Sequence, residues 1–334
     1  MTDVPVREVV RRAGVRRVAE LAGVSPATVS RALREGTPVS AETRARVRRA
    51  AASLGYVVPA RTATVAVLAR FPTRWFFAEA VAGVESVLAA GGHALQLYNV
   101  GDPDGRAHFF DTLPVRGRAD GLIVVATAID EAERAALDGL DVPVVVVGGT
   151  MPGRPRIGID DRAGARTAVR HLVGLGHTEV ALVSFDEDEA CGRETTRARR
   201  AGWAEALDES GRARGPVLEV GADVEAGDAA AGALLSLPRL PTAVFAMSDE
   251  AALGLVRTLR RAGVDVPGSV SVVGFDDHEM AAVADLTTIA QPVHRQGELA
   301  GRAVLAALDG ARPEGAQLPT RLVVRGTTAP PARR

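Results

Sequence analysis

Apolar residues near the N-terminus recur at helical spacing in three short segments, separated by turn-forming residues. The first segment covers residues 18–22 and ends at Gly23, where the end of a helix favours glycine. The second begins with Ser25 at the N-cap and Pro26 at the first helical position, where each residue type is preferred. Ser40 is placed to cap the third segment. The pattern therefore predicts three short helices in a compact N-terminal head.

After residue 59 the pattern changes to short apolar runs, bounded by Gly and Pro, that alternate with amphipathic stretches. Such alternation is typical of repeated strand–helix units around parallel sheets. We expect strands at 65–69, 94–98, 121–125, 144–147, 180–185, 243–246 and 271–275. We expect helices at 77–90, 163–175, 199–208, 250–262 and 297–308. This many units predicts an α/β fold with two doubly wound lobes and a ligand site in the cleft between them, beyond the carboxyl ends of the strands.

Charge is divided unequally between the head and the rest of the chain. Residues 1–61 hold 12 Arg against 5 acidic residues, a net charge of +7, whereas the remaining 273 residues hold 28 Arg against 36 acidic residues, a net charge of −8. A basic head on an acidic body fits a head that meets the phosphates of a nucleic acid. A solvated basic face is the alternative that charge alone leaves open.

Cysteine usage and hydropathy indicate the compartment. The single cysteine, Cys191, cannot form an internal disulfide, which favours a reducing cytoplasm. The N-terminal residues lack the apolar core of a signal peptide, and no run approaches the roughly 20 apolar residues of a membrane span, so we expect neither secretion nor a membrane partner. There is no metal-type Cys/His spacing, phosphate loop, dinucleotide fingerprint or nucleophile elbow. We therefore expect no metal, no cofactor and no enzymatic activity.

The second predicted helix carries the residues expected to read DNA. In a helix-turn-helix this helix enters the major groove by its N-terminal residues, which directs Pro26, Ala27 and Arg31 towards base edges. Arg31 can hold a guanine through two donors, and Ala27 can contact a thymine methyl group. A helical hairpin that serves only packing is the alternative, but an Arg beside small hydroxyl residues on the polar face fits DNA better.

Hydroxyl groups around the start of the same helix are expected to hold phosphates. Thr28 and Ser30, together with the free backbone N–H groups near Ser25, can bind phosphate. Contacts of this kind set the register of the protein on the duplex without reading its sequence. Double-stranded DNA is therefore the expected partner of the head.

The stretch at 18–33 reads VAELAGVSPATVSRAL and closely resembles the head of regulators of the lactose-repressor (LacI/GalR) family. The resemblance continues through 39–44 and 54–56, and in the body through 65–325, with VVGFDD at 272–277 among its motifs. It implies a bacterial, cytoplasmic transcriptional regulator, expected to be a repressor, that reaches the nucleoid through operator DNA. It also implies a homodimer, a small-molecule effector, expected to be a sugar, and a body with the fold of periplasmic sugar-binding proteins.

Pattern and resemblance together predict the domain boundaries. We expect an N-terminal extension at 1–15, a helix-turn-helix domain at 16–56, a short linker at 57–64, and an effector-binding and dimerisation domain at 65–327. Members of the family usually carry a Pro-led segment after the head, which forms a hinge helix and inserts a Leu into the minor groove. The linker here leads almost directly into the first strand, so we expect a truncated hinge that weakens both operator affinity and its coupling to the ligand.

The candidate residues of the cleft suit a neutral, polyhydroxylated ligand. Arg199 and Asp276 can donate and accept pairs of hydrogen bonds, and an aromatic such as Phe77 can cover an apolar ring face. The resemblance makes Arg199 and Asp276 the strongest effector contacts. It also places a second group of contacts at Phe76, Asp160, Ser248 and Gln291.

Structural roles are the alternative for several residues near the cleft. Core packing explains the two phenylalanines equally well, and helix N-capping is the favoured interpretation of Asp161 and Asp277. We interpret His171 and His177 as turn and packing residues rather than as ligands or bases.

Two other functions are compatible with parts of the sequence. A ligand-binding protein that has lost operator binding, because of the short linker, would bind an effector but no operator. A sugar-active enzyme would use the acidic pair Asp276 and Asp277 in metal-assisted chemistry and would show turnover.

Overall fold

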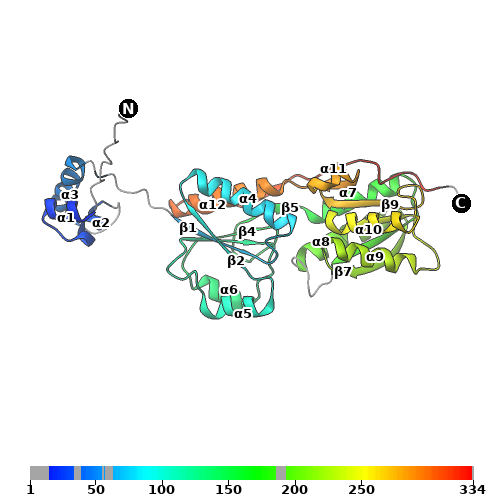
Figure 1. Ribbon diagram of the computed structural model, residues 1–334, viewed down its shortest axis with the longest axis horizontal. Coiled ribbons are helices and arrows are strands. Elements are labelled where there is room, and N and C mark those ends of the chain that lie inside the picture. The colour runs from blue at the N-terminus through cyan, green and yellow to red at the C-terminus, as the bar shows by residue number, and fades with distance from the viewer. Residues whose placement is uncertain (1–14, 34–38, 55, 57–62, 186–192, 333–334) are drawn as a thin grey trace, which may run out of the picture. The chain divides into compact units, whose positions relative to one another are not determined.

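The computed structural model describes residues 15–33, 39–54, 56, 63–185 and 193–332. The chain divides into two compact units, Met1–Thr62 and Ala63–Arg334, which we call the head and the body (Figure 1). The predicted N-terminal extension and truncated hinge fall on residues 1–14 and 57–62, which lie outside the described residues, as does Cys191.

In the described part of the head, three helices lie where the pattern predicts them. They are α1 (Val15–Ala22), α2 (Pro26–Ala32) and α3 (Ala41–Ser53). The hydroxyl of Ser25 accepts a hydrogen bond from the backbone N–H of Thr28 at 3.1 Å, and Ser40 accepts one from Thr43 at 3.2 Å, so both predicted N-caps are confirmed. Gly23 ends α1 with a φ of 62°, the left-handed conformation that glycine adopts most easily. Apolar residues from all three helices form one small core.

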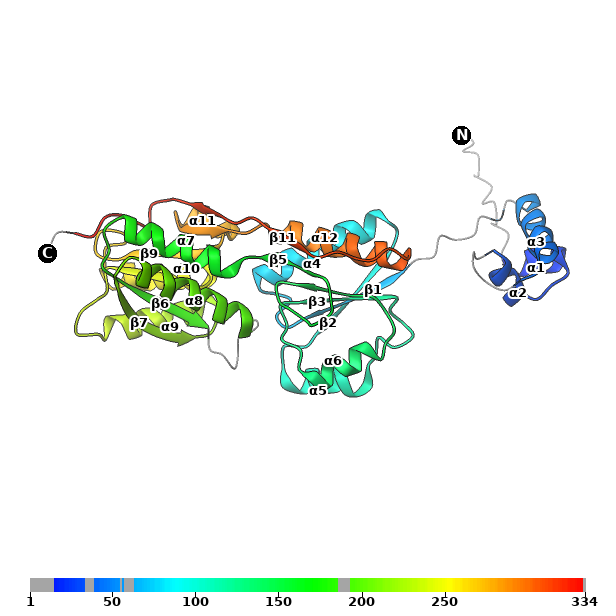
Figure 2. The same ribbon diagram turned by 180° about the vertical axis from the view of Figure 1, so that it is seen from behind.

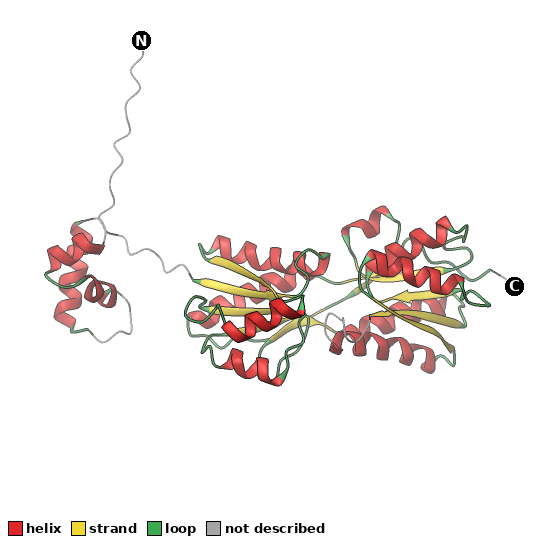
Figure 3. Ribbon diagram, turned by 60° about the horizontal axis from the view of Figure 1, so that its bottom comes forward, coloured by secondary structure: helices red, strands yellow, loops and turns green. Residues whose placement is uncertain are grey.

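The body is built from two lobes, each with a six-stranded sheet between layers of helices (Figures 1 and 3). In lobe 1 the strand order is β11-β5-β4-β3-β1-β2, and all pairs are parallel. Its strands are β1 (Thr64–Ala69), β2 (Ala94–Asn99), β3 (Gly121–Val125), β4 (Val144–Val147), β5 (Arg156–Ile159) and β11 (Ala316–Leu318). One face packs against α4 (Trp75–Ala90) and α12 (Val293–Leu308), the other against α5 (Pro103–Thr112) and α6 (Glu131–Asp138).

Lobe 2 repeats this arrangement with the strand order β12-β10-β9-β8-β6-β7, in which only the β10–β12 pair is antiparallel. Its strands are β6 (Glu179–Phe185), β7 (Ala213–Val220), β8 (Ala243–Ala246), β9 (Ser271–Asp276), β10 (Thr287–Ala290) and β12 (Arg321–Val323). One face packs against α7 (Asp161–Gly174) and α8 (Arg193–Glu209). The other packs against α9 (Val224–Leu235), α10 (Asp249–Arg261) and α11 (Glu279–Val283).

The chain passes between the lobes three times: from β5 to α7, from β10 to α12, and from β11 to β12 (Figure 2). Lobe 1 is therefore discontinuous in sequence, and α12 returns to it only after most of lobe 2. Two glycines fix α12 against α4. A Cβ at Gly83 would lie 2.1 Å from the carbonyl oxygen of His294, and a Cβ at Gly297 would lie 2.1 Å from that of Ala80.

The expected α/β class with two lobes is confirmed. All seven predicted strands are present and differ at their ends by at most one residue. Six of them have apolar runs that are buried on both faces of a parallel sheet, whereas β2 is a partly exposed edge strand. The five predicted helices are also present but begin one to six residues earlier than expected. The pattern missed five strands (β5, β7, β10, β11 and β12) and four helices (α5, α6, α9 and α11).

Candidate effector pocket and DNA-binding head

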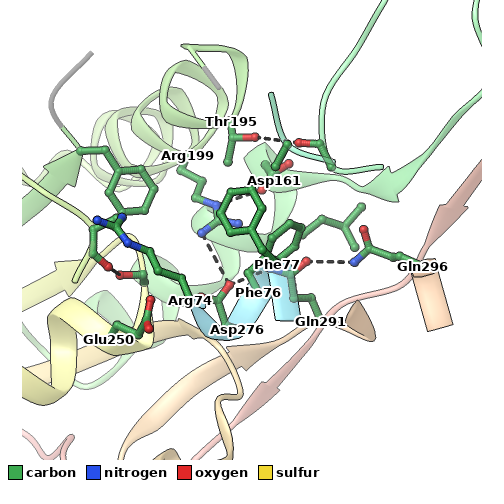
Figure 4. A pocket seen from close by; sticks show the side chains of 16 residues that line it. Arg74, Phe76, Phe77, Asp161, Thr195, Arg199, Glu250, Asp276, Gln291 and Gln296 are labelled. Atoms are coloured by element: carbon green, nitrogen blue, oxygen red, sulfur yellow. Dashed lines mark hydrogen bonds and ion pairs between the residues drawn. The ribbon is translucent and has the colours of Figure 1, made fainter. Parts of the chain in front are cut away.

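A pocket lies between the lobes, at the carboxyl ends of the strands, where the fold predicts the ligand site (Figure 4). Lobe 1 contributes Phe76 and Phe77 from the first turn of α4 and Gln296 from α12. Lobe 2 contributes Arg199 from α8 and Asp276 from the end of β9. Arg74, Gly148, Asp161, Ser248, Glu250 and Gln291 also line the pocket.

Arg199 is the buried cation of this pocket, with 5% of its surface exposed. Its Nε donates a hydrogen bond to Asp161 Oδ1 at 2.9 Å, and its Nη1 donates to the carbonyl oxygen of Met247. Nη1 also lies 3.8 Å from Asp276 Oδ1, and the guanidinium carbon is 3.7 Å from the centroid of the Phe275 ring. Burial of a charge is tolerated only when partners replace water, and these partners hold the guanidinium in one orientation.

A chain of hydrogen bonds continues from Asp276 into lobe 1. Gln291 Nε2 donates to Asp276 Oδ1 at 2.6 Å, and Gln296 Nε2 donates to Gln291 Oε1 at 3.0 Å (Figure 4). Gln291 belongs to the crossing between β10 and α12. Side chains of both lobes and of the crossing therefore form one polar network through the pocket.

The Asp276 carboxyl is held in an environment that disfavours its charge. Burial raises its pKa to about 8, although the Arg199 guanidinium lowers it, and the neighbouring Asp249 raises it further. Asp249 itself is fully buried; burial raises its pKa to about 6, and hydrogen bonds from the Thr288 hydroxyl and the backbone N–H of His278 limit the rise. Burial therefore favours the protonated form of the Asp276 carboxyl.

Aromatic rings form the lobe 1 wall of the pocket. The rings of Phe76 and Phe77 meet edge to face, with centroids 5.6 Å apart at 88°. Phe77 is buried in the core of lobe 1 and Phe76 is half-buried, and both rings line the pocket. Core packing and lining of the pocket are therefore compatible roles for these two residues. A Cβ at Gly148 would lie 2.9 Å from the Phe76 ring, so the loop after β4 needs glycine here.

Ser248 lines the pocket, and its hydroxyl already donates one hydrogen bond and accepts another. It donates to the carbonyl oxygen of Ala222 at 3.3 Å and caps α10 by accepting from the N–H of Ala251 at 3.2 Å. Asp160 does not line this pocket: it is exposed and caps α7, accepting from the N–H of Ala163 at 2.9 Å.

The N-capping interpretation of Asp161 and Asp277 is wrong. Asp161 is the first residue inside α7, where it pairs with Arg199, because Asp160 already caps the helix. Asp277 lies before the cap of α11 and accepts a hydrogen bond from Arg325 at 2.6 Å.

The two histidines do lie in structural contacts. His171 contacts the hydroxyl of Thr328 at 2.9 Å, and the buried His177 contacts the hydroxyls of Thr242 at 2.9 Å and Ser271 at 3.1 Å. Burial lowers the pKa of both imidazoles. Both histidines therefore make packing contacts, and His171 lies within α7 rather than in a turn.

Two charged residues that line the pocket contact the opposite lobe, and sequence reasoning missed them. Arg74 Nη2 donates to Asp223 Oδ2 at 3.2 Å. Glu250 accepts a hydrogen bond from the backbone N–H of Trp75, and burial raises its pKa. The Trp75 ring also meets that of His278, with centroids 5.2 Å apart.

The candidate DNA-reading residues all lie at α2 or its N-cap. Ser25 and Thr28 contact each other through their hydroxyls at 2.9 Å, and Pro26 is the first residue of the helix. Ala27, Ser30 and Arg31 belong to α2, but their side chains lie outside the described part of the chain.

Two further observations concern metals and membranes. Within the described residues, no group of three or more His, Cys, Asp or Glu side chains is arranged to hold a metal ion. None of the helices described for this chain is both long enough and apolar enough to cross a membrane.

A helical head of this kind joined to a two-lobed body with an interlobe pocket defines a ligand-controlled DNA-binding regulator. The family model for bacterial regulatory proteins of the lacI family matches residues 14–58, and that for the periplasmic binding protein-like domain matches residues 169–328. The HTH-type transcriptional repressor PurR of Vibrio campbellii is 32% identical over 301 residues, which cover 86% of this chain and 89% of the relative.

Solved structures agree. The complex of the transcriptional regulator CelR with cellobiose is 30% identical, with a TM-score of 0.71, over 95% of this chain and all of that chain. The lac repressor dimer bound to operator and the anti-inducer ONPF is 27% identical, with a TM-score of 0.73, over 96% of this chain and all of that chain. The chain belongs to the lacI family of bacterial regulatory proteins and is a DNA-binding, effector-regulated transcriptional repressor.

Proposed function

We propose that this repressor binds its operator as a homodimer and that its effector is a neutral sugar held between the lobes by Arg199, Asp276, Gln291 and the aromatic wall. The observation that carries the sugar assignment is the combination of buried hydrogen-bonding groups with the ring of Phe76 in one pocket. Hydroxyl groups pair with the former, and the apolar face of a pyranose or furanose ring covers the latter.

The charges of the pocket favour a ligand without charge. The Arg199 cation is already paired with Asp161, and the Asp276 carboxyl has a pKa of about 8. An anionic ligand would therefore meet a buried cation that is already neutralised, and it would lose its own hydration. A sugar hydroxyl can accept from Arg199 and donate to Asp276 without such a cost.

The placement of these groups gives the ligand a means of control. Phe76 contacts the ligand from lobe 1, and Arg199 and Asp276 contact it from lobe 2, so a bound sugar stabilises the arrangement in which the lobes are close. A ligand shifts a conformational equilibrium only through such differential contacts. Each head immediately precedes lobe 1 in sequence, so the short linker is the route by which such a change in the body would reach the head.

Calorimetry on the full-length chain tests the sugar assignment. We expect a panel of aldopentoses, aldohexoses and cellobiose to contain a ligand that binds, and we expect Asp276→Ala to weaken it strongly while ligand-free DNA binding persists. Absence of binding by every panel member, or unchanged affinity in Asp276→Ala, contradicts the assignment.

The homodimer follows from the size of the head. One head contacts too few base pairs for useful selectivity. Helix-turn-helix proteins obtain this selectivity by binding palindromic sites as two-fold symmetric dimers. Sedimentation at micromolar concentration should show a dimer, and a monomer would contradict the proposal.

The two alternatives predict different outcomes of the same measurements. A relic with a truncated hinge binds the sugar but selects no operator from a pool of DNA fragments. A sugar-active enzyme consumes a panel sugar, which nuclear magnetic resonance of the mixture detects.

A further inference from the structure

Gln296 is a polar residue on the apolar face of α12. The other buried residues of this face are Val293, Gly297, Ala300, Gly301 and Val304. Gln296 itself is fully buried and lines the pocket. A polar side chain at such a position is destabilising unless its donors and acceptors have partners.

Only one half of this amide is paired within the described residues. Gln296 Nε2 donates to Gln291 Oε1 at 3.0 Å, whereas the buried Gln296 Oε1 accepts no hydrogen bond there. A buried acceptor without a donor carries the full cost of its lost hydration. The pocket beside it is where a donor can arrive.

The backbone cannot move to relieve this acceptor. Gly83 and Gly297 bring α4 and α12 into direct backbone contact, so a turn of α12 that exposed Gln296 would force the two helices apart. The acceptor is therefore held at the lobe 1 end of the network that runs through Gln291 and Asp276 to Arg199.

We propose that Gln296 is a specificity-determining effector contact, whose Oε1 accepts a hydrogen bond from a hydroxyl group of the bound ligand. This inference rests on the proposed function, because it places the effector in the same pocket. A ligand of the same shape without a donor at this point leaves the acceptor unpaired and is rejected, since a site built to hydrogen-bond a hydroxyl discriminates strongly against its absence.

A positioning role is the competing explanation. Gln296 could act only by holding Gln291 against Asp276, without contact to the ligand. Both roles predict weaker binding when the amide is removed. They differ in how the variant responds to ligands that lack one donor.

The experiment is calorimetry on full-length wild-type protein and on Gln296→Met, which keeps the unbranched shape and removes the amide; Gln296→Leu is used if the first variant does not fold. Gln96→Met is the matched control, because Gln96 lies on β2 outside the pocket. The probes are the sugars of the panel above. Each sugar that binds is then compared with its deoxyfluoro analogues, in which fluorine replaces one hydroxyl at similar size but cannot donate.

We expect Gln296→Met to lower affinity for the bound sugar about tenfold or more and Gln96→Met to leave it unchanged. One analogue should bind the wild type about tenfold less tightly than its parent, yet bind Gln296→Met as tightly as the parent does. Equal affinity of Gln296→Met and wild type, or the same analogue penalties in both proteins, overturns the inference alone. If no panel sugar binds the wild type, the sugar assignment fails, and this contact fails with it.

Discussion

Arg74, at the N-terminus of α4, forms an ion pair with Asp223, at the N-terminus of α9, and so links lobe 1 directly to lobe 2. Both side chains are partly exposed, at 24% and 42%, and such pairs contribute about 0–1 kcal/mol. The pair therefore biases the arrangement of the lobes only weakly, which suits the ligand-dependent closure proposed for this pocket.

We predict that Asp223→Asn shifts the body towards separated lobes. Asn keeps the cap that Asp223 provides to α9 but removes the charge that attracts Arg74. Effector affinity should fall up to about fivefold, and small-angle scattering of the ligand-free protein should show a larger radius of gyration. Asp228→Asn is the control, since Asp228 pairs with Arg257 inside lobe 2. Equal effects of the two variants would refute the interlobe role.

Arg199→Ala should be strongly destabilising as well as defective in effector binding. It leaves the buried carboxylate of Asp161 and the carbonyl of Met247 without their donor, and breaking a buried pair in this way costs about 3–5 kcal/mol. Urea unfolding measures this cost. The addition of Asp161→Asn should recover part of it. Arg200→Ala, at an exposed pair with Glu219, should change stability by no more than about 1 kcal/mol, and a similar loss there would argue against burial as the cause.

The raised pKa of Asp276 should make the body less stable as pH rises from about 4 to 8, against the opposite effect of the histidines whose pKa burial lowers. Over this range the folded protein retains the proton of Asp276, whose pKa is about 8, whereas an unfolded Asp with a pKa of 3.8 releases it. Arg199, Asp249 and Glu250 act on this carboxyl, and Asp249 adds a smaller effect of the same sign up to about pH 6. Asp276→Asn should therefore show a smaller fall in melting temperature between pH 5 and pH 8. Identical pH profiles would show that Asp276 ionises normally.

Arg31→Ala should lower affinity for the specific operator by about 1–3 kcal/mol while sparing much of the non-specific binding. Arg31 belongs to α2, the helix expected in the major groove. Fluorescence anisotropy with a selected operator and with random DNA measures the specific and the non-specific affinity separately. Equal losses on both would assign Arg31 to a phosphate contact.

The short linker leads to a prediction about coupling. Residues 57–64 offer little chain for a hinge helix, and Pro59 interrupts it near its start. We expect weak, strongly salt-dependent operator binding that the effector changes little, and we expect a family-like hinge inserted between Pro59 and Thr62 to raise both affinity and response. Nanomolar operator binding that the effector abolishes in the natural chain would contradict this.

Apolar periodicity predicted the central strands because they are buried on both faces. It missed the edge strand β7, where Arg214 and Glu219 face solvent, since an edge strand needs no continuous apolar run. It also missed β10, where the buried Thr287 hydroxyl contacts Thr328 and so replaces an apolar side chain. A strand that contains buried polar residues is not recognised from apolar periodicity, because the sequence does not show which partners satisfy those residues.

The same limit applies to the pocket. The resemblance identified Arg199 and Asp276, and the structure brings them together with Gln291 and the two phenylalanines. Gln296 was missed because the predicted helix began at 297, one residue after it, whereas α12 begins at Val293 and places Gln296 on its apolar face. Arg74 was not detectable, since its partner Asp223 is 149 residues away and on the other lobe.

The triple passage of the chain between the lobes also sets the order in which the body can form on the ribosome. Residues 161–290, which include most of lobe 2, emerge before α12, the helix that covers Ile123 and Val145 of lobe 1. At synthesis rates of about 5–20 residues per second, that apolar face stays uncovered for on the order of ten seconds. In a nascent chain that stops before α12, one face of the lobe 1 sheet lacks the helix that would bury it. Such truncated chains should aggregate or be bound by chaperones, even though most of lobe 2 is already complete.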